Sequence, residues 1–380
     1  MNLWSLLFVV MGILSALGLL YLFFRFRRFR FVYRLSLKHR ALGTVIPFLC
    51  VLAVAGIILL VLRDVSFLPF NAAIMLIHLI LFWLICDLIG RIIHGRFVRG
   101  KRAYWQGALA LALTALYLGY GWYSAHHVVR TDYALETDKQ LGAGHIRIAQ
   151  ISDSHVGATF HGAEFADYMR EINETNPDIV VITGDYVDDE TTLEDMLLCG
   201  EALEIFDAPV YWIFGNHDRG YYNYREYSER ELIANLEGHG VTILRDESVY
   251  IEELNLTVVG REDRSAAMFG AGRKSAADLI KDARPDSYIL VLDHEPNDYD
   301  AEAAAGADLV LCGHTHGGQL FPLGYIGLLM GSNDEFYGLS QRQNTLFIVN
   351  SGISNWSIPF KTGCIAEYTI IDISTAAVAE

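Results

Sequence analysis

The sequence predicts a bundle of membrane-spanning helices followed by an α/β domain. Residues 1–130 contain four long apolar stretches, residues 131–143 are expected to be a linker, and residues 144–380 alternate short apolar runs with helical patterns. Charge divides the chain in the same way. Residues 1–130 hold 14 Lys and Arg against two acids, a net charge of +12, whereas residues 131–380 hold 15 against 43, a net charge of −28. The two parts are therefore expected to fold in different environments.

Four stretches are each long enough to cross a bilayer core of roughly 30 Å. They are Trp4–Phe24, Leu42–Leu62, Asn71–Ile89 and Tyr104–Tyr123. Asp87 is the only charged residue within them. No basic residue precedes the first stretch and three further stretches follow it, which argues against a cleaved signal peptide.

Loop charges predict the orientation of this bundle. The loop Arg25–Arg40 holds seven basic residues and the loop Arg91–Arg102 holds five, whereas the loop after the second stretch holds only Arg63. Basic loops stay in the cytoplasm, so both termini and the α/β domain are predicted on the outer side. The acidic α/β domain is not expected to bind nucleic acid, because phosphate backbones are held by Lys and Arg.

The α/β domain is predicted from short runs rich in Val, Ile and Leu, bounded by Gly and Asp, which are typical of buried strands. The expected strands are Ile146–Ile151, Ile179–Thr183, Val210–Phe214, Tyr288–Leu292 and Leu309–Cys312. The expected helices between them are Glu164–Glu174, Leu193–Ile205, Glu229–Leu236 and Ala276–Ala283. This alternation predicts a layered α/β architecture.

Five polar blocks follow the predicted strands, four of them directly. They are D-S-H at Asp153–His155, G-D-Y-V-D at Gly184–Asp188, G-N-H-D at Gly215–Asp218, D-H at Asp293–His294 and G-H-T-H at Gly313–His316. Their oxygen and imidazole nitrogen atoms are common ligands of divalent metal ions, from the hard magnesium ion to the softer zinc ion. Ligands in layered α/β sheets gather at the carboxyl ends of strands. The blocks therefore predict a metal site at one edge of the domain.

These blocks resemble the motifs of the calcineurin-like metallophosphoesterases, from about Gly144 to the C-terminus, and the run Gly313–Gln319 resembles the membrane-associated bacterial branch of that family. The resemblance implies two facing β-sheets flanked by helices and a site for two divalent ions, which could be Mn, Zn, Fe or Mg. One ion is then expected on Asp153, His155, Asp185 and His316. The second is expected on Asp185, Asn216, His294 and His314.

The expected reaction is hydrolysis of a phosphomonoester or phosphodiester by a hydroxide shared between the two ions, which clamp the attacking and leaving oxygens. The catalytic residues are expected to be His217, which donates a proton or hydrogen bond to the departing oxygen, and Asp218, which orients the ring of His217. Asp188 is expected to support a ligand or to cap a helix.

The substrate is expected to carry a single phosphate on a lipid or a small molecule. The apolar run Leu320–Met330 and the tyrosines Tyr221, Tyr222 and Tyr224 either pack against the domain or form an apolar rim that accepts a lipid tail. Two other functions remain open: a non-catalytic binding module with the same fold, and a pyrophosphohydrolase of the UDP-diacylglucosamine type. The intact His217 argues against the first, and the predicted outward topology argues against the second.

Overall fold

A computed structural model of the chain describes residues 3–63, 65, 67–97, 104–220, 225–270 and 272–376. The chain divides into two compact units, Met1–Tyr120 and Gly121–Glu380. Tyr221, Tyr222 and Tyr224 lie outside the described residues, as do Arg99, Lys101 and Arg102 of the second basic loop.

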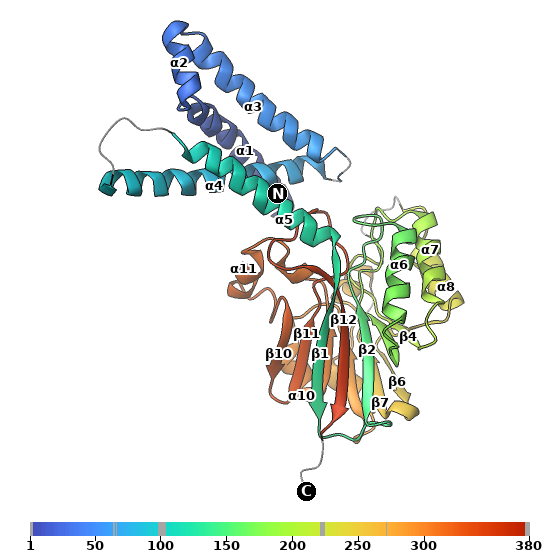
Figure 1. Cartoon of the computed structure of the whole chain (residues 1–380). Helices are drawn as coiled ribbons and strands as arrows, with labels where there is room; N and C mark the ends of the chain where they lie inside the picture. Colours follow the sequence, from blue (N-terminus) through green and yellow to red (C-terminus); the bar gives the residue numbers. More distant parts are fainter. Residues whose placement is uncertain are drawn as a thin grey trace. The chain divides into compact units, whose positions relative to one another are not determined.

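The first unit is helical (Figure 1). Its helices are α1 (Leu3–Phe26), α2 (Arg30–Lys38), α3 (Leu42–Val61), α4 (Leu68–Phe97) and most of α5 (Gln106–His126). Three described segments are long and apolar enough to cross a membrane: Phe8–Phe26, Leu42–Val61 and Leu68–Ile93. Helix α5 covers the fourth predicted span but is not among these candidates, so that span stays a prediction. The first basic loop differs from expectation, because it contains the short helix α2.

The second unit contains two six-stranded sheets. The first has the order β1-β12-β2-β3-β4-β5. Its strands are β1 (Val128–Thr137), β12 (Ala366–Thr375), β2 (His145–Ile151), β3 (Ile179–Ile182), β4 (Val210–Trp212) and β5 (Val241–Ile243). Strands β2 to β5 run parallel, whereas β12 is antiparallel to β2 and parallel to the edge strand β1.

The second sheet has the order β10-β11-β9-β8-β7-β6. Its strands are β10 (Gly338–Arg342), β11 (Thr345–Val349), β9 (Leu309–Cys312), β8 (Tyr288–Leu292), β7 (Leu256–Gly260) and β6 (Glu247–Ile251). The four central strands β11, β9, β8 and β7 are parallel, and both edge strands are antiparallel to their neighbours. Five predicted strands are therefore confirmed at the centres of the two sheets.

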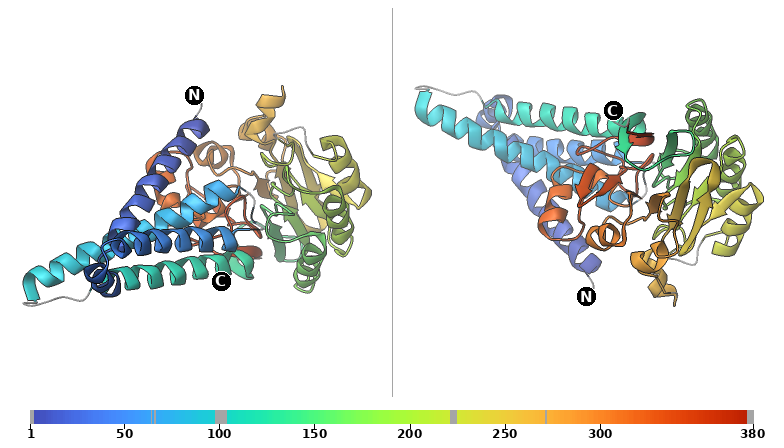
Figure 2. Two further views of the ribbon diagram at one scale, coloured as in Figure 1. Left: turned by 90° about the horizontal axis from the view of Figure 1, so that it is seen from above. Right: turned by 90° about the horizontal axis from the view of Figure 1, so that it is seen from below.

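The sheets face each other and helices cover their outer sides (Figures 1 and 2). Buried side chains of both sheets, such as Ile148 and Leu290, form one shared core. The helices α6 (Gly162–Asn173), α7 (Leu193–Leu203) and α8 (Glu229–Gly238) pack on the first sheet, and α9 (Ala276–Ile280) and α10 (Tyr299–Ala305) on the second. Shorter elements are η1 (Glu252–Leu254), η2 (Arg264–Phe269), η3 (His316–Gly318) and α11 (Leu323–Leu329). This four-layer arrangement confirms the fold expected from the resemblance.

The expected linker 131–143 is wrong over its first half, because residues 131–137 belong to β1. Exposed and more buried side chains alternate along this strand from Arg130 to Leu135. That alternation of two is the pattern of a half-exposed strand, and ten register pairs with β12 stabilise it. The boundary between the two compact units, after Tyr120, also lies earlier in the chain than the boundary predicted at residue 130.

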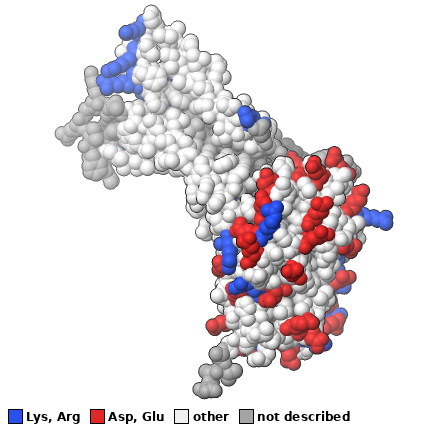
Figure 3. All heavy atoms as spheres, turned by 45° about the vertical axis from the view of Figure 1, so that its right-hand side comes forward, with Lys and Arg blue, Asp and Glu red and all other residues white. Residues whose placement is uncertain are grey.

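Charge follows the division of the chain (Figure 3). Aspartate and glutamate side chains are scattered over the visible face of the second unit, with fewer Lys and Arg among them. This face therefore carries part of the calculated net charge of −28 for residues 131–380.

Candidate metal centre

The carboxyl ends of five strands bring the predicted ligands to one edge of the second unit. Strands β2, β3 and β4 end at Ile151, Ile182 and Trp212, and β8 and β9 end at Leu292 and Cys312. The predicted ligands that follow these ends are Asp153, His155, Asp185, Asn216, His294, His314 and His316. The first sheet thus supplies four of them and the second sheet supplies three.

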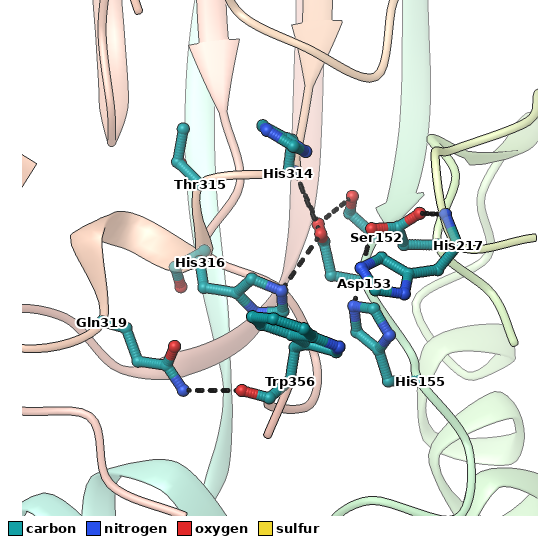
Figure 4. A network of polar contacts seen from close by, with 12 residues as sticks. Ser152, Asp153, His155, His217, His314, Thr315, His316, Gln319 and Trp356 are labelled. Atoms are coloured by element: carbon teal, nitrogen blue, oxygen red, sulfur yellow. Dashed lines mark hydrogen bonds and ion pairs between the residues drawn. The ribbon is translucent and has the colours of Figure 1, made fainter. Parts of the chain in front are cut away.

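A first cluster consists of Asp153, His155 and His316, whose side chains converge in Figure 4. All three are buried, and their ligand atoms lie within 4.8 Å of one another. The Nε2 atom of His316 is 3.5 Å from Oδ1 of Asp153. The Nδ1 atom of His155 lies 3.4 Å from Oδ2 of Asp188, a distance within ion-pair range, although it has no hydrogen-bond partner among the described residues. The opposite ring nitrogen, Nε2, lies 3.6 Å from Oδ2 of Asp185.

A second cluster consists of Asp185, His294 and His314. The Nε2 atom of His294 is 3.1 Å from Oδ2 of Asp185 and 3.3 Å from Nδ1 of His314. Asn216 joins the cluster, because its Oδ1 atom is 2.9 Å from Nδ1 of His314. The Nδ1 atom of His294 lies 2.8 Å from the carbonyl oxygen of Thr183. If Nδ1 of His294 carries the proton, it donates a hydrogen bond to this carbonyl oxygen, and the lone pair of Nε2 is available to bind a metal ion.

Asp185 lies between the two clusters. Its Oδ2 atom is 3.1 Å from Nε2 of His294 in the second cluster and 3.6 Å from Nε2 of His155 in the first. Its Oδ1 atom accepts a hydrogen bond of 2.8 Å from the backbone N–H of His217. One carboxylate is therefore held within reach of both groups of ligands.

The chemistry of these donors fits divalent metal ions. Imidazole nitrogens and carboxylate oxygens converge, and the Nε2 atom of the buried His155 has no hydrogen-bond partner among the residues that the structure describes. Its distance of 3.6 Å from Asp185 is too long for a hydrogen bond. A buried polar atom without a partner is costly, and a cation at the centre of each cluster would satisfy the converging lone pairs.

Backbone strain is concentrated at the same residues. Asp153, His155, Asp185, His314 and His316 all have positive φ angles, between 34° and 68°. Non-glycine residues rarely adopt this left-handed region, and where they do, the surrounding structure must impose it, most often at functional sites. The strand ends thus turn sharply so that both ligands of a block can point into the centre.

Two glycines are needed because the loops pass close to one another. A Cβ atom on Gly184, whose φ is +88°, would lie 2.6 Å from the backbone nitrogen of Gly215 and 2.7 Å from Nδ1 of His294. A Cβ atom on Gly215 would lie 2.2 Å from Oδ1 of Asp185. The glycines of the G-D and G-N-H-D blocks therefore let the two ligand loops touch.

His217 lies beside the clusters, but Asp218 does not take the role expected for it. The ring of His217 is 5.0 Å from that of His155, centroid to centroid. The carboxylate of Asp218 is buried and accepts four backbone hydrogen bonds of 2.7 to 3.1 Å, from the N–H groups of Asp185, Tyr186, Val187 and Gly215. Because donors of the neighbouring loop occupy both oxygens, Asp218 ties the two ligand loops together. The expectation that it orients the ring of His217 is replaced by this structural role.

Burial and opposite charge shift the pKa values of the site in different directions. Burial raises the pKa of Asp185, but the neighbouring His294 and His217 rings bring this pKa well below its usual value. Burial lowers the pKa of His217 to about 4, against the opposing effect of Asp185. Burial and the Asp185 charge raise the pKa of Asp218 to about 7, while backbone N–H groups of Gly215 and Val187 oppose the shift. All four donors to Asp218 are N–H groups, so its surroundings suit the ionised carboxylate.

Sequence reasoning missed the loop that follows β11. Its Gly352 lies against the metal site, since an added Cβ would be 2.8 Å from Cβ of Asp153. The ring of Trp356 lies 5.2 Å from that of His217 (Figure 4). Lys361 is fully buried and donates hydrogen bonds to the carbonyl oxygens of Ser351 and Gly352, at 2.5 and 3.0 Å. The sequence did carry a signal for this loop, because the short apolar strand β11 is followed by polar residues and glycine, as the strands before the ligand blocks are.

Comparisons with known proteins place these motifs in context. Residues 146–318 match the calcineurin-like phosphoesterase family. The chain is 31% identical over 196 residues to a metallophosphoesterase of Aquifex aeolicus, covering 51% of this chain and 71% of the relative. It is 25% identical over 282 residues to YkuE of Bacillus subtilis, covering 71% and 94%. It is 29% identical over 287 residues to a transmembrane protein with metallophosphoesterase domain from Danio rerio, covering 71% and 63%. The chain spans less than two thirds of the length of the first animal relatives that it matches.

Proposed function

The chain belongs to the calcineurin-like metallophosphoesterase family, and from this premise we propose that its second unit hydrolyses a phosphoester at a site for two divalent metal ions. The position of Asp185 carries the proposal. Its Oδ2 atom lies 3.1 Å from a ligand nitrogen of one cluster and 3.6 Å from a ligand nitrogen of the other. A carboxylate in this position can bridge two ions, which is the arrangement that dinuclear phosphoesterases need.

Each side chain has a definite task in this proposal. Two divalent ions, when bound, would supply Lewis acidity at the phosphoryl oxygens and lower the pKa of a water molecule. Asp153, His155 and His316 would hold one ion, Asn216, His294 and His314 the other, and Asp185 both. Asp188 and the carbonyl of Thr183 fix the rings of His155 and His294.

His217 is the group proposed to act on the leaving oxygen. Burial lowers the pKa of its ring to about 4, and the charge of Asp185 opposes this shift. A phosphate arriving beside the ring would raise this pKa, because negative charge stabilises the imidazolium. The protonated ring would then give its proton to the oxygen that leaves phosphorus.

The proposed substrate is a phosphomonoester or phosphodiester of a membrane lipid or a lipid-linked group, on the outer side of the membrane. Three described segments long and apolar enough to cross a membrane support a membrane setting. The distribution of basic residues between the loops supports the outward orientation of the catalytic unit. The acidic surface of the second unit disfavours polyanionic substrates, since like charges repel.

The test is the replacement Asp185→Asn in the full chain. The variant is expected to hold one metal ion or fewer where the parent holds about two, and to lose nearly all turnover, because the bridge contacts both ions. Bound metal is counted by mass spectrometry, and turnover is measured on phosphomonoester, phosphodiester and phospholipid panels with manganese, zinc and magnesium. Asp300→Asn, which removes the same charge from a side chain that is 89% exposed, is the control.

Two tightly bound ions together with full turnover in Asp185→Asn would refute the bridge. A parent protein that binds two ions but hydrolyses no ester on any panel would instead favour a non-catalytic binding module. Selective cleavage of a UDP-linked lipid pyrophosphate would favour the pyrophosphohydrolase.

A further inference from the structure

A groove opens directly beside the second metal cluster. Its volume is about 250 Å³, and its lining includes His314, Leu323, Gly327, Phe336 and Ile358. Thr315 and Gln319, which are labelled in Figure 4, also line it. Complete small-molecule sites commonly measure roughly 300–1,000 Å³, so the groove has room for part of a ligand. Because His314 belongs to both, the groove continues the metal site.

The helix α11 that forms one wall of the groove exposes large apolar side chains. Leu329 is 88% exposed, Met330 is 76% exposed and Phe321, just before the helix, is 58% exposed. No charged residue occurs in residues 320–332, although the second unit as a whole is strongly acidic. From α11 itself, Leu323, Gly324 and Gly327 line the groove, so the wall that this helix contributes carries no charge.

We propose that this groove binds the apolar chain of an amphiphilic phosphoester while the phosphate of the same molecule lies at the metal clusters. The inference rests on the proposed function and adds the part of the substrate that is recognised. The continuity of groove and metal site through His314 places a chain attached to the phosphate in the groove. Leu323, Phe336 and Ile358 match an alkyl chain, and no Asp, Glu, Lys or Arg is among the described residues that line the groove.

Gly327 offers a substitution that fills the groove with little risk to the fold. An added Cβ atom there meets no atom within 4 Å, and the residue lies inside α11. Gly327→Leu should also favour the helix, because glycine is the poorer helix former. The matched control is Gly238→Leu, at the end of α8, where an added Cβ likewise meets nothing within 4 Å.

The experiment compares the full chain and both variants in nanodiscs, loaded with manganese. Affinities for methylphosphonate and octylphosphonate are measured by calorimetry. Hydrolysis of 4-nitrophenyl methyl phosphate and 4-nitrophenyl octyl phosphate is followed alongside. Both esters release the same leaving group, so they differ only in the chain. Each buried methylene should tighten binding by roughly fourfold.

With three or more methylenes buried, octylphosphonate should bind the parent chain and Gly238→Leu at least about 50-fold more tightly than methylphosphonate. In Gly327→Leu this ratio should fall at least tenfold. A ratio that is unchanged in Gly327→Leu, or near one in the parent chain, would overturn the proposal.

The two hypotheses can fail separately. A chain-length preference that depends on Gly327, without turnover of either ester, would support the groove and refute the proposed hydrolysis. Equal binding of both phosphonates with normal turnover would refute the groove alone. If Gly327→Leu changes only the size of the assembly in light scattering, the groove is an interface between copies and the proposal is wrong.

Discussion

Replacing Asp218 with asparagine should destabilise the second unit instead of slowing a chemical step. The carboxylate accepts two backbone N–H groups on each oxygen: Asp185 and Gly215 on one, Tyr186 and Val187 on the other. In asparagine an NH₂ group replaces one of the two oxygens. The two backbone N–H groups that this oxygen accepted would then face another donor, and both hydrogen bonds would be lost. Each hydrogen bond to a charged group contributes roughly 1.5–3 kcal/mol, which gives a loss of about 3–6 kcal/mol.

Such a loss should lower the melting temperature of the second unit by roughly 6–24 °C, since each kcal/mol shifts a domain of this size by about 2–4 °C. The assay is thermal unfolding of the full chain in detergent, with bound metal counted at 20 °C. Metal content should fall as well, because the loop that carries Asp185 is released. Asp300→Asn removes the same charge at an exposed position and should change stability by less than about 0.5 kcal/mol. A variant with the parent melting temperature and full metal content, but a reduced kcat, would restore the catalytic role first expected for Asp218.

Three further outcomes are expected. His217→Ala should keep its bound metal and lower turnover by roughly 10²–10⁴, less with a leaving group as good as 4-nitrophenolate; loss of metal would make His217 a ligand. Asp188→Asn should weaken metal binding by roughly 10–100-fold, because it lies 3.4 Å from Nδ1 of His155 and fixes that ring, and an unchanged affinity would contradict this role. A reporter active only outside the cytoplasm should be active after Glu380 and inactive in the loop Arg25–Arg40, and the reverse pattern would place the second unit inside.

The strands that precede the ligand blocks were predictable because they are buried on both sides, whereas the similarly buried β7, β11 and β12 were not predicted. Such strands appear as continuous apolar runs, and β8 and β9 were predicted at their observed bounds. The edge strand β1 was not predicted, because its side chains alternate between exposed and partly buried. Strand β5 was not predicted either, because it is only three residues long. Helix starts were approximate, since the N-cap of α6 is His161, an unusual residue for that position.

The predicted ligands could be found because metal binding demands particular donor types at strand ends. The role of Asp218 could not, because its donors at Asp185 to Val187 come from a different loop about 32 residues earlier in the chain. The position of Trp356 beside the site was not predicted for a different reason. It is not a ligand type, and only the folded loop brings it beside His217.

The strand β1 and the end of α5 determine where the second unit can be cut from the rest of the chain. The carbonyl oxygens of Gly121 and Ala125 accept hydrogen bonds of 2.8 Å from the backbone N–H of Lys361 and the side chain of Asn355. A fragment starting at residue 144 would lose these acceptors, and β12 would become an unprotected edge of ten residues. Bare apolar edges recruit other chains, so such a fragment should aggregate. A soluble form that keeps the loop after β11 intact must therefore retain α5 from Gly121 onward, and proteolytic release of an intact second unit requires cleavage before Gly121.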